Sequence, residues 1–168
     1  VLPKKLSNYV ISRFMLFLYD VKNIYFTTNK SDAILAFYNP EDGIYYLYPE
    51  RPAYINNLIR QFSKEMTTKD IAEVVSYLSD TAELATPCNN PDYVPLNNGI
   101  FDYKSKQLMP FTPKLIFVAK SSVNYNPNAT NIVLHNDDDN TNWDVESWVA
   151  DLSYNPEVVN LLWQIIGA

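Results

Sequence analysis

Residues 97–110 carry an Asn-Asn-Gly turn, the run Ile-Phe-Asp-Tyr, a polar Lys-Ser-Lys-Gln reversal and then Leu-Met-Pro. Asn and Gly tolerate positive φ, so they favour the tight turn of a hairpin. The alternation of apolar and polar residues after the turn has the two-residue period of a strand. This stretch therefore predicts a β-hairpin in the middle of the chain.

Further patterns predict helices and short strands on both sides of this hairpin. Apolar residues at helical spacing indicate a helix over 7–20 with Ser7 as its N-cap, and Val10, Phe14, Phe17 and Leu18 as its apolar set. Two more helices follow Pro52 and a Thr67–Asp70 capping box, as an antiparallel pair or a helix-turn-helix corner. Closing helices are expected over 144–152 and 156–166. Strands are expected over 24–28, 33–38, 44–48 and 115–119, and a surface loop over most of 124–142.

We therefore predict an α+β fold with a small antiparallel sheet, hairpins and about five helices. With 168 residues, 47% of them hydrophobic, the chain can form one sizeable core. We expect a single domain over 1–168, excised from a larger protein. Its parts are a front helix and hairpin (1–50), a helix pair (51–85), a central hairpin region (92–129) and closing helices (142–168).

The single cysteine, Cys88, excludes an internal disulfide, and no apolar run is long enough to span a bilayer. A reducing cytosolic compartment and no membrane partner are the simplest interpretation. The net charge of −6 and the sequence pI near 4.7 disfavour a broad phosphate-binding surface. The cations lie mainly towards the front and an acidic run lies near the end, so a local basic patch stays open.

Three groups of residues stand out in order along the chain. They are an aromatic-N-x-x-x-G-x-Y hairpin, an N-G-aliphatic-aromatic-D turn with L-x-P and a later Y-x-P-x-A, and Trp-containing closing helices that end in Gly. Together they resemble the domain that precedes the superfamily 3 helicase core in phage and plasmid primase-helicases and poxvirus-type replication NTPases. The matching positions are Tyr38, Gly43, Tyr45, Asn98, Gly99, Asp102, Pro110, Tyr125, Pro127, Ala129, Trp143 and Gly167.

The resemblance implies a non-catalytic accessory domain that positions or assembles the adjacent helicase, with the matching residues as turns and packing anchors. It implies helicase and primase domains as partners in the parent chain, and a hexamer only in the full-length protein. ATP and magnesium are expected only in the helicase core. The chain itself has no G-x-x-x-x-G-K-[ST] loop, so we expect no cofactor and no ATPase activity in it. A bacterial host cytoplasm is the implied location.

Two other functions stay open. In a DNA-binding module, tyrosines would stack on bases while cations follow the phosphates. The candidates are Tyr46, Arg51, Tyr103, Lys104, Lys106 and Lys120. A small hydrolase or nuclease would need clustered carboxylates, or Cys88 and His135 in one pocket. Because Asp137–Asp139 are consecutive residues of an expected loop, we interpret them as a solvated tip and predict no metal site and no catalytic residue.

Overall fold

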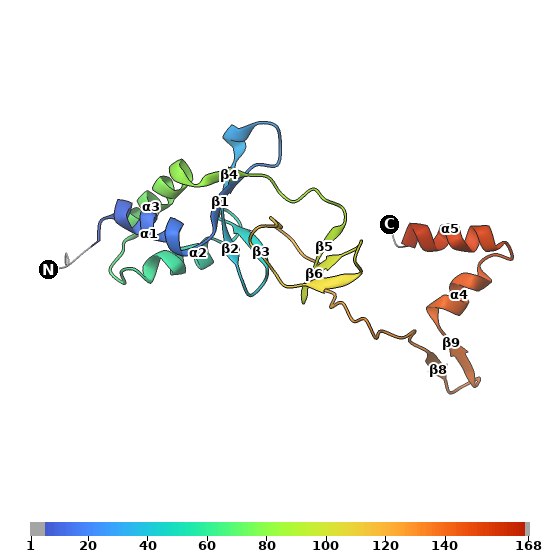
Figure 1. Cartoon of the computed structure of the whole chain (residues 1–168). Coiled ribbons are helices and arrows are strands. Elements are labelled where there is room, and N and C mark those ends of the chain that lie inside the picture. The colour runs from blue at the N-terminus through green and yellow to red at the C-terminus, as the bar shows by residue number, and fades with distance from the viewer. Residues whose placement is uncertain (1–5, 167–168) are drawn as a thin grey trace. The chain divides into compact units, whose positions relative to one another are not determined.

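The computed structural model describes residues 6–166. Their contacts fall into two compact units, Val1–Tyr125 and Asn126–Ala168. The described residues form five α-helices, one short 3-10 helix and small, mainly antiparallel sheets, which confirms the predicted α+β class (Figure 1). The single excised domain over 1–168 stays a prediction.

A four-stranded sheet with strand order β3-β2-β1-β4 lies at the centre of the first unit. β1 pairs antiparallel with β2, and β2 with β3, whereas β4 runs parallel to β1. The strands are β1 (Val21–Ile24), β2 (Ile34–Asn39), β3 (Ile44–Leu47) and β4 (Glu83–Ala85). β2 and β3 are the strands predicted near 33–38 and 44–48, whereas the three-residue β4 is too short to leave a periodic pattern.

β1 lies earlier in the chain than the strand predicted over 24–28, so that prediction was wrong. Lys22 and Asn23 interrupt its apolar pattern. Asn23 is nevertheless buried, and its side-chain amide donates to the carbonyls of Ser79 at 2.7 Å and Ala82 at 3.2 Å. These carbonyls lie at the end of a helix and need donors, so the tertiary fold stabilises a polar side chain inside the sheet.

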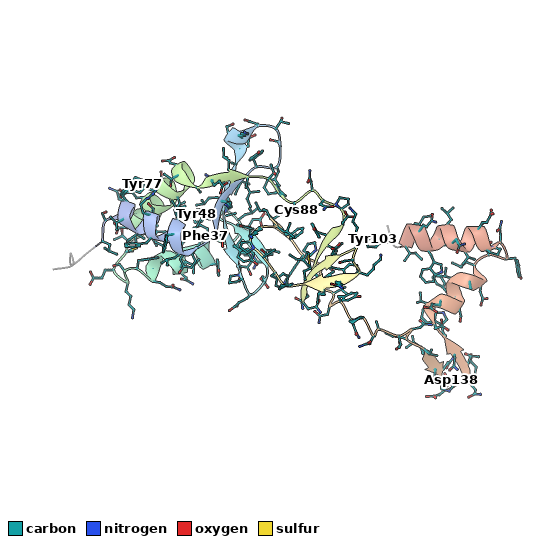
Figure 2. All side chains as sticks on the ribbon, in the orientation of Figure 1. Phe37, Tyr48, Tyr77, Cys88, Tyr103 and Asp138 are labelled. Carbon is teal, nitrogen blue, oxygen red and sulfur yellow. The ribbon has the colours of Figure 1, made fainter. Side chains whose placement is uncertain are left out.

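Three helices cover one face of this sheet (Figure 1). They are α1 (Asn8–Leu18), α2 (Pro52–Arg60) and α3 (Thr68–Thr81). The predicted N-cap Ser7 and the Thr67–Asp70 capping box are both formed. Alternate residues of β2 point to this face, among them Phe37, which is fully buried and labelled in Figure 2. The shared core is Ile11, Met15, Val21, Leu35, Phe37, Ile55, Ile59, Met66, Ile71, Val74 and Leu78.

The buried face of α1 differs from the predicted apolar set. Ile11 and Met15 are buried, whereas Phe14 and Leu18 are exposed and Phe17 is 86% exposed. The helix is apolar on more than one side, so spacing alone did not identify the side that meets α3. α3 contacts α1 far more extensively than it contacts α2. The second and third helices, which were predicted to form a pair, therefore share only a minor contact.

The opposite face of the sheet is covered by the segment over residues 115–119. Ile116 and Val118 pack against the β2 and β3 side chains of this face. The predicted strand at 115–119 was wrong, because its backbone has no single partner strand. The carbonyl of Phe117 accepts from the Tyr45 N–H at 2.7 Å, whereas that of Ile116 accepts from the Cys88 N–H at 2.8 Å.

The predicted central hairpin is part of a second sheet, with antiparallel order β5-β6-β7. Its strands are β5 (Tyr93–Leu96), β6 (Gly99–Asp102) and β7 (Gln107–Met109). The Asn-Asn-Gly turn joins β5 to β6, and the polar reversal joins β6 to β7. Ile100 is fully buried and joins Tyr46 and Phe117 in a core between the two sheets. This hairpin prediction is therefore confirmed, with β5 added.

The second unit contains a hairpin and two helices (Figure 1). They are β8 (Leu134–Asn136), β9 (Thr141–Trp143), α4 (Val145–Asp151) and α5 (Pro156–Ile166). The closing helices are confirmed, whereas the loop over 124–142 was partly wrong. Asn and Asp in this stretch form a turn between strands, with Asn140 at φ 55°, a conformation that Asn tolerates.

Candidate functional site

The turn between β2 and β3 explains the first family motif. The side-chain oxygen of Asn39 accepts from the Glu41 N–H at 2.9 Å, and its carbonyl accepts from the Gly43 N–H at 2.8 Å. Gly43 has φ +70°, and a Cβ built on it would lie 2.0 Å from the ring of Phe111. Glycine is needed here both for the backbone angle and for the close aromatic ring.

The two motif tyrosines beside this turn are packing residues of the sheet. The rings of Tyr38 and Tyr45 lie 5.3 Å apart on adjacent strands, and both are buried. The Tyr45 hydroxyl donates to the carbonyl of Pro113 at 2.9 Å. Burial raises the pKa of both phenols above the ordinary tyrosine value.

Asn98 connects the second motif to its distant Y-x-P-x-A part. Its side-chain oxygen accepts from the Tyr125 N–H, and its amide donates to the Tyr125 carbonyl, both at 2.9 Å. The side chain thus pairs with Tyr125 as a neighbouring strand would. Tyr125 also packs its ring 4.6 Å from that of Phe101 on β6. These contacts connect the two parts of the second motif, which lie 27 residues apart in the chain.

The remaining residues of the second motif shape its turns. A Cβ on Gly99 would lie 2.6 Å from the carbonyl oxygen of Met109 on β7. The Asp102 carboxylate accepts from the N–H of Lys104 at 2.9 Å and the hydroxyl of Ser105 at 2.8 Å. These bonds, the Ser105 hydroxyl first, lower the pKa of Asp102. Pro110 follows the last residue of β7, where a missing N–H ends the pairing.

Three of the residues predicted to bind nucleic acid lie around Asp42, beside the turn between β2 and β3. The Tyr46 hydroxyl donates to the Asp42 carboxylate, and the Lys120 ammonium lies 3.1 Å from it. The Arg51 guanidinium lies 4.1 Å from the centroid of the Tyr46 ring. The hydrogen bond from Tyr46, followed by that from Lys120, lowers the pKa of Asp42. Tyr46 is 7% exposed, so its ring offers little surface for a stacked base.

The other three residues predicted to bind nucleic acid lie on the β6–β7 turn. They are Tyr103, Lys104 and Lys106, and we call them the Tyr103 cluster. Tyr103 is 60% exposed and is labelled in Figure 2. The Lys106 ammonium lies 3.2 Å from the centroid of its ring, and Lys106 itself has φ 57°. Lys104 pairs with Asp92 at 2.7 Å, and this hydrogen bond raises the pKa of Lys104. The cluster combines an exposed ring with two cations.

The residues considered for hydrolysis lie in different units. Cys88, half-buried in the first unit, donates its N–H to Ile116, whereas His135 on β8 contacts Asn142 at 2.8 Å. Asp137–Asp139 form the tip of the β8–β9 hairpin, where Figure 2 labels Asp138. Asp139 accepts from the N–H and hydroxyl of Thr141. Within residues 6–166, no group of three His, Cys, Asp or Glu side chains is arranged to hold a metal ion.

The second unit contains an open apolar groove that sequence reasoning missed. Its cavity of about 600 Å³ is lined mainly by apolar residues, including the motif residues Ala129 and Trp143. Pro127 lies in the turn before it, where the Ala129 N–H donates to the Asn126 carbonyl at 3.1 Å. The cluster of Ile132, Val133 and Leu134 inside a polar stretch was the available signal. Gly167 lies outside the described residues.

The charged side chains are distributed unequally between the two units. All thirteen Lys and Arg residues lie at or before Lys120. The second unit holds seven acidic residues, Asp137, Asp138, Asp139, Asp144, Glu146, Asp151 and Glu157. The net charge of −6 therefore comes from the second unit, and it does not weigh against phosphate binding by the first.

These features define an α+β domain whose motif residues hold turns and join distant segments. A family model described as D5 N terminal like matches residues 15–153. The chain belongs to this family, the N-terminal domain of D5-like primase-helicases, which lies upstream of the superfamily 3 helicase. The predicted resemblance is confirmed over both hairpin motifs and Trp143, while α5 lies beyond the matched residues. No curated protein matches the chain.

The family places this chain in the context of DNA replication, within a larger primase-helicase. Among the helices of residues 6–166, none combines the length and the apolar character that crossing a bilayer requires.

Proposed function

We propose that this chain is a non-catalytic accessory domain of a phage or plasmid replication protein, which positions the adjacent superfamily 3 helicase and assists its assembly. The match over residues 15–153 is the observation that carries the proposal. The roles of the motif residues support it, because Asn98 and Gly43 act on backbone geometry rather than on a reacting group.

In this proposal the chemistry belongs to other parts of the parent protein. ATP and magnesium bind in the helicase core, priming belongs to the primase domain, and hexamers form only in the full-length protein. The protein acts in the cytoplasm of a bacterial host. The first unit of the chain contributes a connection in which the two larger sheets share one core through Tyr46, Ile100 and Phe117.

The test compares the full-length parent protein with a version that lacks residues 1–168. Hexamer formation is measured by analytical ultracentrifugation, and ATP hydrolysis and duplex unwinding are measured at equal subunit concentration. We expect weaker assembly and loss of unwinding, with residual ATPase activity retained in the helicase core. Normal assembly and unwinding without these residues would contradict the positioning role, and ATP hydrolysis or primer synthesis by the isolated chain would contradict its non-catalytic character.

A second candidate function is binding of single-stranded or duplex DNA through the Tyr103 cluster. The observation that favours it is the exposed Tyr103 ring with Lys106 above it and Lys104 beside it. Aromatic rings next to cations are the usual elements of a single-strand site. The test is fluorescence anisotropy of labelled single-stranded and duplex oligonucleotides at low and high salt.

If this site binds DNA, the affinity falls steeply as salt rises. Tyr103→Ala then weakens single-strand binding about fivefold or more, because stacking contributes roughly 1–3 kcal/mol per base. Tyr154→Ala is the control, since Tyr154 is also exposed but lies in the acidic second unit. No anisotropy change at high micromolar protein would remove this candidate.

A further inference from the structure

The second unit leaves most of its large apolar side chains exposed. Val149 is its one fully buried hydrophobic residue among those described. Ile132, Leu134 and Trp143 on the groove walls are 74%, 57% and 48% exposed. Soluble monomers seldom expose apolar surface over a continuous patch of this kind unless it meets a partner.

Electrostatics restrict what that partner can be. The groove includes Glu146, and Asp144 lies next to its wall residues Trp143 and Val145. No Lys or Arg occurs anywhere in the second unit. A negatively charged surface of this kind repels nucleic-acid phosphates and anionic lipid, and it repels an identical copy of itself. It attracts a positively charged surface that also carries apolar side chains.

We propose that this groove binds a basic amphipathic segment of a protein partner, with apolar side chains inserted between Leu134, Trp143 and Trp163 and Lys or Arg beside Glu146. An amphipathic helix laid into a groove is a common mode of peptide recognition. Tryptophan at the centre of such a surface contributes strongly to binding. This inference goes beyond the proposed function and does not rest on it.

The test uses the whole chain and a synthetic probe. The probe is a Trp-free helical peptide of roughly five turns, made of Leu, Ala and Lys with Leu on one face. A second peptide replaces every Lys by Glu and keeps the apolar face. All three tryptophans of the chain lie in the second unit, so their emission reports on this unit alone. We expect the Lys peptide to shift the emission to the blue and to reduce acrylamide quenching, whereas the Glu peptide does neither.

Two pairs of variants locate the site. Ile132→Asn replaces an aliphatic side chain of the apolar wall by a polar amide without adding charge, and it weakens binding about tenfold, as expected for the loss of one buried aliphatic side chain. Val123→Asn makes a comparable change at a similarly exposed residue of the first unit and leaves binding unchanged. Glu146→Lys weakens binding about fivefold, whereas Asp151→Lys, on the same helix but outside the groove, has a smaller effect. Circular dichroism checks that each variant is folded.

Three outcomes would overturn the proposal. Equal binding of the Lys and Glu peptides would show an unspecific apolar surface. Concentration-dependent dimers that Ile132→Asn disperses would assign the groove to a second copy of the chain. Tryptophan emission that is already blue and protected without peptide, and unchanged by it, would show that the face is covered within the chain itself.

Discussion

Asn98 substitutes a side chain for a strand, because its amide makes both hydrogen bonds that a neighbouring backbone would make to Tyr125. Asn98→Ala removes both bonds at an exposed position, so we expect a loss of about 1 kcal/mol in the free energy of unfolding. Urea unfolding followed by circular dichroism measures it. Asn89→Ala changes another exposed Asn of the first unit and is expected to have almost no effect; equal losses in both variants would contradict the pairing role.

Gly43 is restricted by its own backbone and by the ring of Phe111. Gly43→Ala meets an unfavourable φ and a ring 2.0 Å from the new Cβ, so we expect a loss of about 2–4 kcal/mol in stability. Chemical denaturation of the single and double variants separates the two causes. The loss should be smaller when Gly43→Ala is made in a Phe111→Ala background, since only the φ penalty remains. An unchanged loss in that background would show that Phe111 plays no part.

At the scale of elements, α4 begins at an N-cap whose ionisation can be followed. Asp144 accepts from the Ser147 N–H at 2.9 Å, the Ser147 hydroxyl at 2.7 Å and the Asn131 amide at 2.6 Å. These bonds, the Ser147 N–H first, lower its pKa to about 2. Because the folded-state pKa lies below the unfolded value near 3.9, the stabilisation is present above that value and is lost as pH falls towards about 2.

An acid titration of tryptophan emission tests this N-cap, since Trp143 and Trp148 lie on either side of Asp144. We expect a transition with an apparent pKa near 2 in the original chain, because loss of the N-cap frays the start of α4. Asn also caps helices but does not titrate in this range, so Asp144→Asn should remove the transition. Asp138→Asn, at the exposed hairpin tip, should retain it; if Asp144→Asn also retained it, another group would be responsible.

At the scale of the whole molecule, the two compact units predict a preferred site of proteolysis. Residues 126–133 have no regular secondary structure, and Ile132 and Val133 are exposed. Exposed backbone without sheet or helix hydrogen bonds is cut first. We expect brief thermolysin treatment to cleave before Ile132 or Val133, with the fragments identified by mass spectrometry. Replacing both residues by Ser should slow this cut; a first cut inside the four-stranded sheet would contradict the division into units.

Local patterns predicted most elements of this fold. The capping box of α3, Pro52 at the start of α2 and the Asn-Asn-Gly turn depend on residues close in the chain, so short-range reasoning could find them. The motif positions were also predicted as structural, but their contacts were not. Nothing local indicates that Asn98 meets Tyr125 or that Phe111 lies over Gly43.

The amino-acid sequence by itself determined the α+β class, the helices and the central hairpin, because capping, periodicity and turn residues act over a few positions. The family followed from the resemblance of its motifs. Only the tertiary structure decided which side of α1 is buried, that β4 joins β1, and that residues 115–119 cover a sheet without forming a strand. It also showed the division into units and the apolar groove of the second. These features depend on segments far apart in the chain, whose contacts leave no periodic pattern in either segment alone.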